Sequence, residues 1–426
     1  MNNATKSRWS IHSAFSGMSH DTMYPIIILL AVGFVVRLFA HQIDFSFEND
    51  VRTFQIWGAM LFQDGFGAFF AQEGLTDYPP MYMYVLFLIG ALRAAFDLDF
   101  LSPMLNFFTF LPAMLADLGL GFMIYYFAKK SGLKQSLALM LCAFWIFNPA
   151  IILISSIWGQ VESVFLLFLL PSLWFLHDRK LLPAYILFGF AIMTKPQSLF
   201  LGPVYLYSAI DFYLQHKNAG LKTIFTSIAA GGLTMVVVSI PFGVIKTFRM
   251  LFAGMDMYNF ATVNAFNLWG LLGKNWVPLE TPFLGLTFGT WGIIIALAII
   301  IGAMLVLYFD DIKNNRHNFF LIVAAIFILI FVFSVKMHER YLFPGLLFLV
   351  VYMIKNRNWK IAGLYVVFSV TFFINCIEIL RWLRGGFQLS VIEMSTPIIS
   401  AVNVLFSIIF SWVMFKCLNK NESKKQ

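Results

Sequence analysis

The sequence predicts an all-α membrane protein that crosses the bilayer many times. Of its 426 residues, 60% are hydrophobic and only 12% are charged, and the mean hydropathy is +0.81. The apolar residues form runs that approach the length of a membrane-spanning helix, which is about 20 residues. Soluble globular proteins do not combine such a composition with such runs. We therefore expect one large membrane domain rather than a soluble core.

Twelve apolar runs are expected to form membrane-spanning helices. They cover residues 24–40, 103–127, 135–155, 161–176, 182–193, 198–213, 222–245, 289–309, 318–335, 341–354, 361–380 and 397–415. A thirteenth run, residues 81–96, is long enough to cross but carries Arg93 and follows the pair Pro79-Pro80.

The distribution of basic residues decides where the thirteenth run lies, because cytoplasmic loops of membrane proteins are enriched in Lys and Arg. If residues 81–96 lie on the outer surface, 18 of the 29 basic residues fall in cytoplasmic segments. If they cross, every later loop changes sides and the basic clusters face outward. We therefore predict about twelve spans, cytoplasmic termini and juxtamembrane helices on the outer surface in the first external loop.

The predicted organisation is a single transmembrane domain. The domain covers residues 23–415, between a cytoplasmic N-terminal segment, residues 1–22, and a cytoplasmic tail, residues 416–426. Its largest external loops are residues 41–102 and 246–288. The first apolar run lacks a small-residue cleavage site, so we expect it to remain as an anchor rather than to be removed as a signal peptide.

The composition also argues against two kinds of site. The net charge of +8 comes from short basic runs between apolar segments, where basic residues set topology, so nucleic-acid binding is not expected. The three cysteines lack the spacing of a zinc site, and two of them fall inside apolar runs. No disulfide framework or zinc centre is predicted.

The first external loop contains a concentration of acids. Residues 44–80 hold six acidic residues and a single basic one. Glu48 and Asp50 lie at the head of this loop, and Asp77-Tyr78 precedes the paired prolines. A carboxylate in this position can act as a general base or bind a ligand. The simpler alternatives are a solvated charge for Glu48 and a helix cap for Asp77.

Cationic side chains lie in two other external turns. Lys195 precedes Pro196, which interrupts an apolar run, and a lysine at such a break is costly unless it faces water or an anion. His338, Glu339 and Arg340 lie in one short connection, which can bind a phosphate through charge-assisted hydrogen bonds, with Glu339 orienting the planar fork of Arg340. A snorkelling lysine and an ordinary charged connector are the alternatives.

The remaining candidates are polar residues near these turns that can bind a ligand at the membrane edge, namely Gln160, Glu162 and Gln197. Capping or packing is the simpler role for single residues of this kind. Glu48, Asp50 and Asp77 can together hold a divalent metal, but their spacing is not diagnostic, so neither a metal nor a cofactor is predicted. The chain also lacks a P-loop and a GxGxxG motif.

Five fragments together resemble the GT-C class of multi-span glycosyltransferases that use lipid-phosphate sugars. They are Asp50 with Trp57 seven residues later, Asp77-Tyr78-Pro79-Pro80, Asn148-Pro149 followed by Trp158-Gly159-Gln160, Lys195-Pro196-Gln197, and His338-Glu339-Arg340-Tyr341. The pattern is similar to bacterial relatives of the second mannosyltransferase of GPI-anchor synthesis. It also resembles the glucosyltransferases that finish the N-glycan precursor, although these tend to have Glu-Lys where this chain has Glu339-Arg340.

The resemblance implies a GT-C-like fold and a specific chemistry. Asp50 is similar in place to the catalytic base of the family, and His338-Glu339 to a motif near the lipid phosphate. The implied reaction transfers a hexose, mannose or glucose, from a polyprenyl-phosphate sugar to an acceptor hydroxyl with inversion. The acceptor is a glycan, a lipid or a protein. The implied location is the bacterial cell membrane, with the site on the extracytoplasmic side and a role in cell-envelope or other glycan synthesis.

Two other functions remain open from the sequence. A secondary transporter also has about twelve spans, but it tends to place charged residues and broken helices near the bilayer midplane in repeated halves. Here the charged residues gather at the predicted outer ends, and no repeat is visible. A flippase for lipid-linked sugars is the third alternative. Vesicle uptake without sugar transfer would favour transport, and donor turnover by the protein alone would favour an enzyme.

Overall fold

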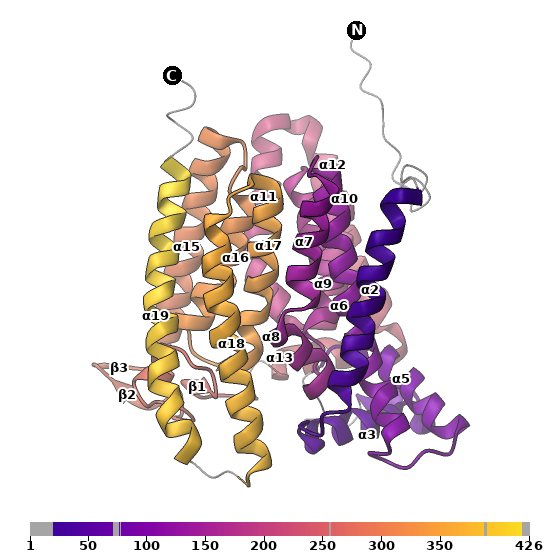
Figure 1. Cartoon of the computed structure of the whole chain (residues 1–426). Helices are drawn as coiled ribbons and strands as arrows, with labels where there is room; N and C mark the ends of the chain where they lie inside the picture. The colour runs from indigo at the N-terminus through magenta and orange to yellow at the C-terminus, as the bar shows by residue number, and fades with distance from the viewer. Residues whose placement is uncertain (1–19, 71–75, 77, 255–256, 387–389, 420–426) are drawn as a thin grey trace.

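The computed structural model is a bundle of long helices (Figure 1), and it describes residues 20–70, 76, 78–254, 257–386 and 390–419. The long helices run roughly parallel, while several short helices and strands gather at the lower end in this view. The first residue of the first helix, α2, and the last residue of the final helix, α19, both lie at the upper end. The two ends of the described chain therefore lie on the same side of the bundle.

The part of the chain up to residue 216 forms α2 (His20–His41), α3 (Glu48–Asp64), α4 (Phe66–Phe69), α5 (Pro80–Ala95), α6 (Pro103–Lys130), α7 (Gln135–Ile146), α8 (Pro149–Ile152), the π-helix η1 (Leu153–Trp158), α9 (Glu162–His177), α10 (Leu181–Thr194), the 3-10 helix η2 (Pro196–Leu201) and α11 (Gly202–His216). The rest forms α12 (Asn218–Ser239), η3 (Ile240–Phe242), α13 (Val244–Gly254), β1 (Thr262–Val263), α14 (Leu268–Leu271), β2 (Pro282–Phe283), β3 (Leu286–Thr287), α15 (Phe288–Asn314), α16 (Phe319–Phe333), β4 (Met337–His338), η4 (Glu339–Leu342), α17 (Phe343–Asn356), α18 (Lys360–Arg384) and α19 (Ser390–Asn419).

The all-α, multi-pass character predicted from the sequence agrees with this architecture. Each of the twelve predicted apolar runs overlaps a helix. Among the described residues, six helices are long and apolar enough to cross a membrane, and a seventh is counted if α7 and the segment Pro149–Trp158, bent by 46°, form one span. Others, such as α9, α10 and α16, are apolar but shorter. The total of twelve crossings remains a prediction.

Two helix breaks shape the connections at the lower end. Asn148 caps α8 by accepting a hydrogen bond from the Ala150 N–H at 2.9 Å, and Pro149 occupies the first helical position, where its missing N–H is not needed. Lys195 has an extended backbone, with φ −153° and ψ 125°, as a residue before proline favours. The break predicted at Lys195-Pro196 is confirmed, because α10 ends at Thr194.

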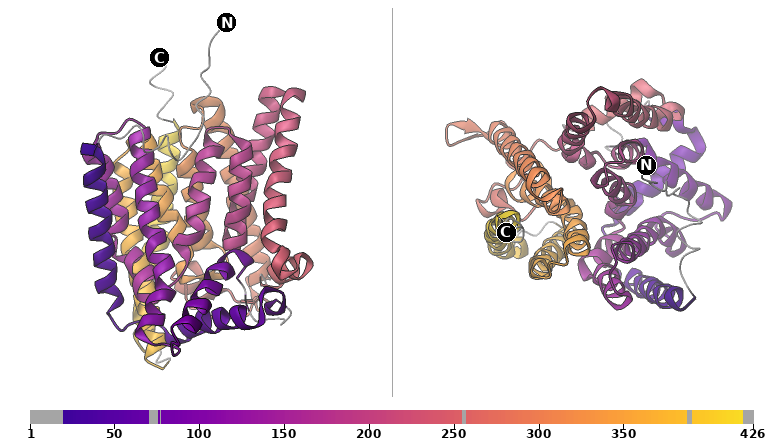
Figure 2. Two further views of the ribbon diagram at one scale, coloured as in Figure 1. Left: turned by 90° about the vertical axis from the view of Figure 1, so that its right-hand side faces the viewer. Right: turned by 90° about the horizontal axis from the view of Figure 1, so that it is seen from above.

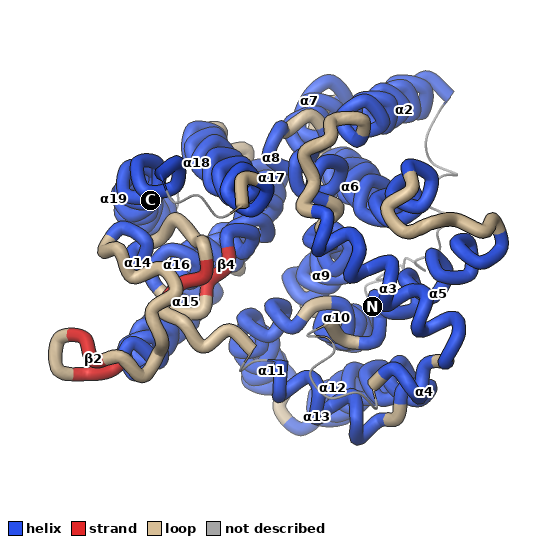
Figure 3. Tube along the Cα trace, turned by 90° about the horizontal axis from the view of Figure 1, so that it is seen from below, coloured by secondary structure: helices blue, strands red, loops and turns tan. Residues whose placement is uncertain are grey.

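The helices α3 and α5 form a platform at the lower end of the bundle, across the direction of the long helices (Figures 2 and 3). Their backbones approach closely at two glycines, since a Cβ on Gly90 would lie 2.0 Å from the carbonyl oxygen of Gly58. An aromatic cluster that includes Phe54 and Tyr82 fills the rest of the interface. A helix thus forms where the outer-surface helix was predicted, and its placement relative to a bilayer remains a prediction.

A buried ion pair joins the helices of the N-terminal group. Arg37 of α2 donates hydrogen bonds of 3.0 and 2.9 Å to Asp117 of α6, and a third of 2.9 Å to the carbonyl of Ile146 at the end of α7. Ser163 of α9 also donates to Asp117. Charges inside spanning helices are tolerated only when they are paired in this way. The network fixes α7 immediately before the break at Pro149.

The C-terminal group of helices, from α15 to α19, lies beside the group that contains α2 to α12 when the bundle is viewed along its axis (Figure 2, right). In the C-terminal part, β1 pairs in parallel with β4, with Thr262 opposite Met337 and Val263 opposite His338. This pairing fastens the long connection before α15 to the segment that carries residues 338–340.

Candidate active site

Asp50 lies in the first turn of α3, and two side chains from the end of η1 and the connection after it hold its carboxylate. Trp158 Nε1 and Gln160 Nε2 each donate a hydrogen bond of 2.9 Å to Asp50 Oδ2. The Asp50 side chain keeps 34% of its surface exposed. A carboxylate that is oriented by two donors and still open to solvent can accept a proton from an incoming hydroxyl.

Arg340, in η4, contacts carboxylates from three different elements. Its Nη1 atom lies 3.9 Å from Asp50 Oδ2 and 3.4 Å from Glu339 Oε1, and its Nε atom lies 3.5 Å from Glu162 Oε1. The guanidinium carbon lies 5.1 Å from the centre of the Trp158 ring, within the range of a cation–π contact. Burial opposes the positive charge, but the carboxylates of Glu339 and Glu162 outweigh burial and hold the pKa of Arg340 well above its usual value.

Glu162 and Lys195 form the most deeply buried pair of the site. Glu162 is the first residue of α9, and its side chain is 2% exposed. Its Oε1 atom contacts Lys195 Nζ, which also lies 5.8 Å from the centre of the Tyr78 ring. A buried carboxylate is stable in its ionised form only beside positive charge. Lys195 and Arg340 together supply that charge.

His338 and Glu339 are buried next to these cations. Burial, together with the positive charges of Arg340 and Lys195, lowers the pKa of His338 well below its usual value, so the imidazole is neutral at pH 7. Burial raises the pKa of Glu339, and the neighbouring carboxylates of Asp50 and Glu162 act in the same direction while Arg340 opposes them. His338 therefore contributes a neutral hydrogen-bonding ring to the site rather than a charge.

A cavity of about 540 Å³ opens beside the charged cluster. Its polar wall includes Lys195, Gln197, Lys336, His338 and Arg340. Most of the remaining wall is apolar and includes Leu199 and Phe200 of η2 together with Ile293 and Ala296 of α15. Because the residues from α15 recur at helical spacing, the cavity follows one face of that helix over about two turns. The cavity suits an amphiphile with an anionic head and an apolar tail.

The structure brings most of the predicted site residues together. Direct contacts connect Asp50, Gln160, Glu162, Lys195, Glu339 and Arg340, and Tyr78, Gln197 and His338 line the adjoining cavity. Glu48 is exposed, and within the described part of the chain no hydrogen bond or ion pair connects it to the cluster. Asp77 lies outside the described residues.

Trp158 is a site residue that the sequence analysis did not include among its candidates. It donates to Asp50, and its ring lies 5.1 Å from the guanidinium carbon of Arg340, so it contacts both residues. A signal was present, since Trp158 lies two residues before the candidate Gln160 and follows the break at Asn148-Pro149. In the residues that the structure describes, no group of three or more His, Cys, Asp or Glu side chains is placed to hold a metal ion.

The comparison with known families covers part of this site. Residues 71–257 match the model of the ALG6, ALG8 glycosyltransferase family. The matched stretch is somewhat less than half of the chain; it includes Tyr78, Gln160, Glu162 and Lys195 and leaves out Asp50 and residues 338–340. Together with the apolar helices, the match supports a membrane glycosyltransferase of the GT-C class that uses lipid-linked sugar donors.

Proposed function

We propose that this protein transfers a hexose, mannose or glucose, from a polyprenyl-phosphate sugar to an acceptor hydroxyl on the extracytoplasmic face of the membrane. The observation that carries the proposal is the contact between the two halves of the site. Asp50, oriented by Trp158 and Gln160, lies 3.9 Å from Arg340, which in turn lines the amphiphilic cavity. A base for the acceptor thus lies beside a cation for the donor phosphate.

In the proposed reaction, the Asp50 carboxylate takes the proton of the acceptor hydroxyl as the oxygen attacks the anomeric carbon. The bond between that carbon and the phosphate oxygen breaks, and its electron pair stays on the phosphate. Because attack and departure occur on opposite faces, the configuration at the anomeric carbon inverts. The leaving group is a phosphate, so it needs positive charge rather than a proton, and the single carboxylate base differs from the pair that glycoside hydrolases use.

The other residues of the site have roles on the donor side in this proposal. Lys195 and Arg340 stabilise the charge that develops on the departing phosphate, and neutral His338 donates or accepts one hydrogen bond. Tyr78 and Gln197 line the cavity near the head group, and the lipid tail follows the apolar wall formed by η2 and α15. Glu162 and Glu339 hold the two cations, and Glu48 and Asp77 stay candidates for substrate binding.

The test incubates purified protein with polyprenyl-phosphate mannose or glucose and follows the release of polyprenyl phosphate. We expect Asp50→Asn to lower the rate of transfer by about 10²–10⁴-fold, the usual contribution of a general base, and to leave the thermal unfolding midpoint nearly unchanged. Asp64→Asn, at the exposed end of the same helix, is the matched control and should behave like the wild type. Full activity of Asp50→Asn would refute the assignment, as would vesicle uptake of sugar without transfer.

A further inference from the structure

Glu162 occupies an unusual position for a carboxylate. Its side chain is 2% exposed, yet only Oε1 contacts the cations Lys195 and Arg340. In the described part of the chain, Glu162 Oε2 has no hydrogen-bond partner. A buried carboxylate oxygen without a partner costs free energy. The position of Glu162 at the start of α9 partly offsets that cost, because the helix dipole favours negative charge there.

Arg340 is also held loosely. Its contacts with Asp50, Glu162 and Glu339 are 3.9, 3.5 and 3.4 Å long, which is longer than charge-assisted hydrogen bonds of about 2.7–2.9 Å. Within the described residues, Arg340 Nε is buried without a hydrogen-bond partner. The guanidinium is therefore attracted by charge but not fixed in a bidentate geometry, so it can turn toward another anion.

The charges around this cluster are already balanced by the protein itself. Up to three negative charges come from the acids Asp50, Glu162 and Glu339. Three positive charges come from Lys195, Arg340 and, on the cavity wall, Lys336. A donor phosphate adds negative charge next to carboxylates that use the same cations. Its binding is favourable only if one of those carboxylates gives up its contacts.

We propose that Glu162 is a displaceable counter-ion, which competes with the phosphate of the lipid ligand for Lys195 and Arg340. When the phosphate binds, the two cations turn toward the cavity, and when the product polyprenyl phosphate leaves, Glu162 recovers them. Glu162 thereby lowers the affinity for both donor and product and favours release of the more highly charged product. This inference rests on the proposed function for the identity of the ligand, but its test does not need the transfer reaction.

The test measures binding of farnesyl phosphate to the purified full-length protein in detergent by isothermal titration calorimetry. Glu162→Gln keeps the shape of the side chain and removes its charge. We expect this variant to bind farnesyl phosphate at least roughly fivefold more tightly. A unit charge about 4 Å from the phosphate changes the affinity by about that factor even in a high dielectric. Glu162→Asp keeps the charge but moves it away from the cations. Its affinity for farnesyl phosphate should lie between that of the wild type and that of Glu162→Gln, so it tests the inference even if Glu162→Gln is unstable.

Two controls separate the competition from other effects. Farnesol, which has the same tail without phosphate, should bind all three proteins equally. Glu280→Gln removes one exposed acid from the long connection before α15 and should leave farnesyl phosphate affinity unchanged. Weaker or equal binding by Glu162→Gln would overturn the inference and show that Glu162 only positions the cations, and the proposed transferase function would still stand. If Glu162→Gln bound farnesyl phosphate more tightly but the wild-type protein transferred no sugar, the inference would be supported and the proposed transferase function refuted.

Discussion

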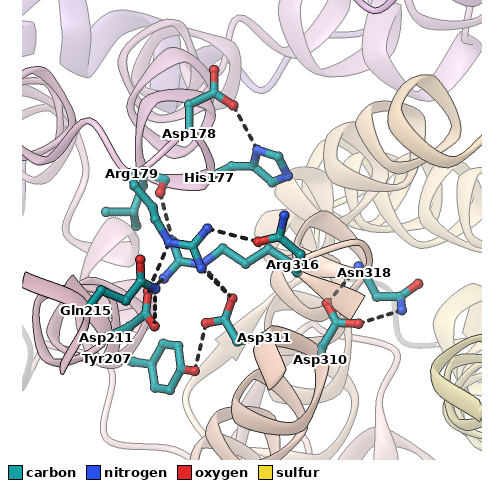
Figure 4. A network of polar contacts seen from close by, with 12 residues as sticks. His177, Asp178, Arg179, Tyr207, Asp211, Gln215, Asp310, Asp311, Arg316 and Asn318 are labelled. Carbon is teal, nitrogen blue, oxygen red and sulfur yellow. Dashed lines mark hydrogen bonds and ion pairs between the residues drawn. The ribbon is translucent and has the colours of Figure 1, made fainter. Parts of the chain in front are cut away.

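Two charged clusters lie at opposite ends of the bundle, and they are built differently. At the upper end, Arg316 donates hydrogen bonds of 2.8 Å to Asp311 and 2.7 Å to Asp211 (Figure 4). Arg179 contacts the same two aspartates at 3.3 and 3.2 Å, and Tyr207 donates to Asp311 at 2.7 Å. Two cations and two carboxylates thus satisfy each other at hydrogen-bonding distance.

The cluster around Arg340 at the lower end has the same kinds of residues but a looser geometry. Its cation-to-carboxylate contacts at Arg340 are 3.4 Å or longer, and the buried atoms Arg340 Nε and Glu162 Oε2 lack hydrogen-bond partners in the described structure. A cavity adjoins this cluster. The comparison teaches that pairing alone does not identify a site. A cluster with complete pairing stabilises the fold, whereas one with incomplete pairing beside a cavity is suited to bind a ligand.

The largest effect that follows from this comparison concerns stability at the upper end. Arg316 is 1% exposed, lies in the connection between α15 and α16, and contacts α11, α15 and the end of α9. Arg316→Ala leaves Asp311, 5% exposed, and Asp211, 14% exposed, with incomplete pairing, so we expect a loss of about 3 kcal/mol in the free energy of unfolding, the lower end of the range for a broken buried pair. The measurement is thermal unfolding in detergent, and sugar transfer per folded molecule should stay close to that of the wild type. Lys313→Ala, at an exposed position of α15, is the control. If Arg316→Ala lost transfer without losing stability, the distinction between the clusters would be wrong.

The second prediction is the converse, at the lower end. Arg340→Gln removes the cation that stabilises the departing phosphate in the proposed reaction, and loss of one such group typically lowers kcat by about 10²–10³-fold. Because the contacts of Arg340 are long and incomplete, we expect the unfolding midpoint to change much less than in Arg316→Ala. Steady-state kinetics and thermal unfolding of the two variants, measured side by side, check the pair. Equal destabilisation by both substitutions would contradict the comparison.

The third prediction sharpens the role of Trp158. Trp158→Phe keeps an aromatic ring near Arg340 but removes the hydrogen bond to Asp50, while Gln160 continues to donate. A hydrogen bond to a charged group contributes about 1.5–3 kcal/mol, and since one of two donors remains, we expect kcat to fall by roughly tenfold, near the lower limit of that range. Unchanged kcat in Trp158→Phe would show that Gln160 alone orients Asp50.

The parts of the fold that the sequence could predict are those in which local chemistry decides the structure. Apolar runs predicted the helices, and Lys195-Pro196 predicted a break because proline removes a backbone donor whatever the surroundings. The sequence analysis also placed Asp50, Lys195 and Arg340 on one side of its predicted topology, although it did not predict their contacts.

What the sequence could not predict depends on packing between distant segments. The contact of Trp158 with Asp50 joins residues 108 positions apart, and the ion pair of Arg37 with Asp117 joins residues 80 positions apart. The sequence analysis counted the charges but had no means to pair them. The incomplete pairing of Glu162 Oε2 is a property of atoms in three dimensions and leaves no mark in the residue order.

The smallest effect concerns pH and follows from the buried imidazole of His338. In the folded protein its pKa lies well below the usual value, whereas in the unfolded chain it is about 6.5. Below pH 6.5 the unfolded state therefore binds a proton that the folded state does not. The contribution of His338 to stability is thus fully present above pH 6.5 and is lost as the pH falls. The loss in the free energy of unfolding is at most about 1.4 kcal/mol per pH unit. Thermal unfolding from pH 7.5 to 5.0 should show a steeper loss of stability for the wild type than for His338→Asn. His216→Asn, at an exposed position of α11, is the matched control for replacing a histidine by asparagine. Identical slopes for His338→Asn and the wild type would contradict this prediction. A shallower loss of stability for the wild type than for His338→Asn would mean that His338 is protonated in the folded site, and in the proposed reaction it would then join Lys195 and Arg340 as a cation.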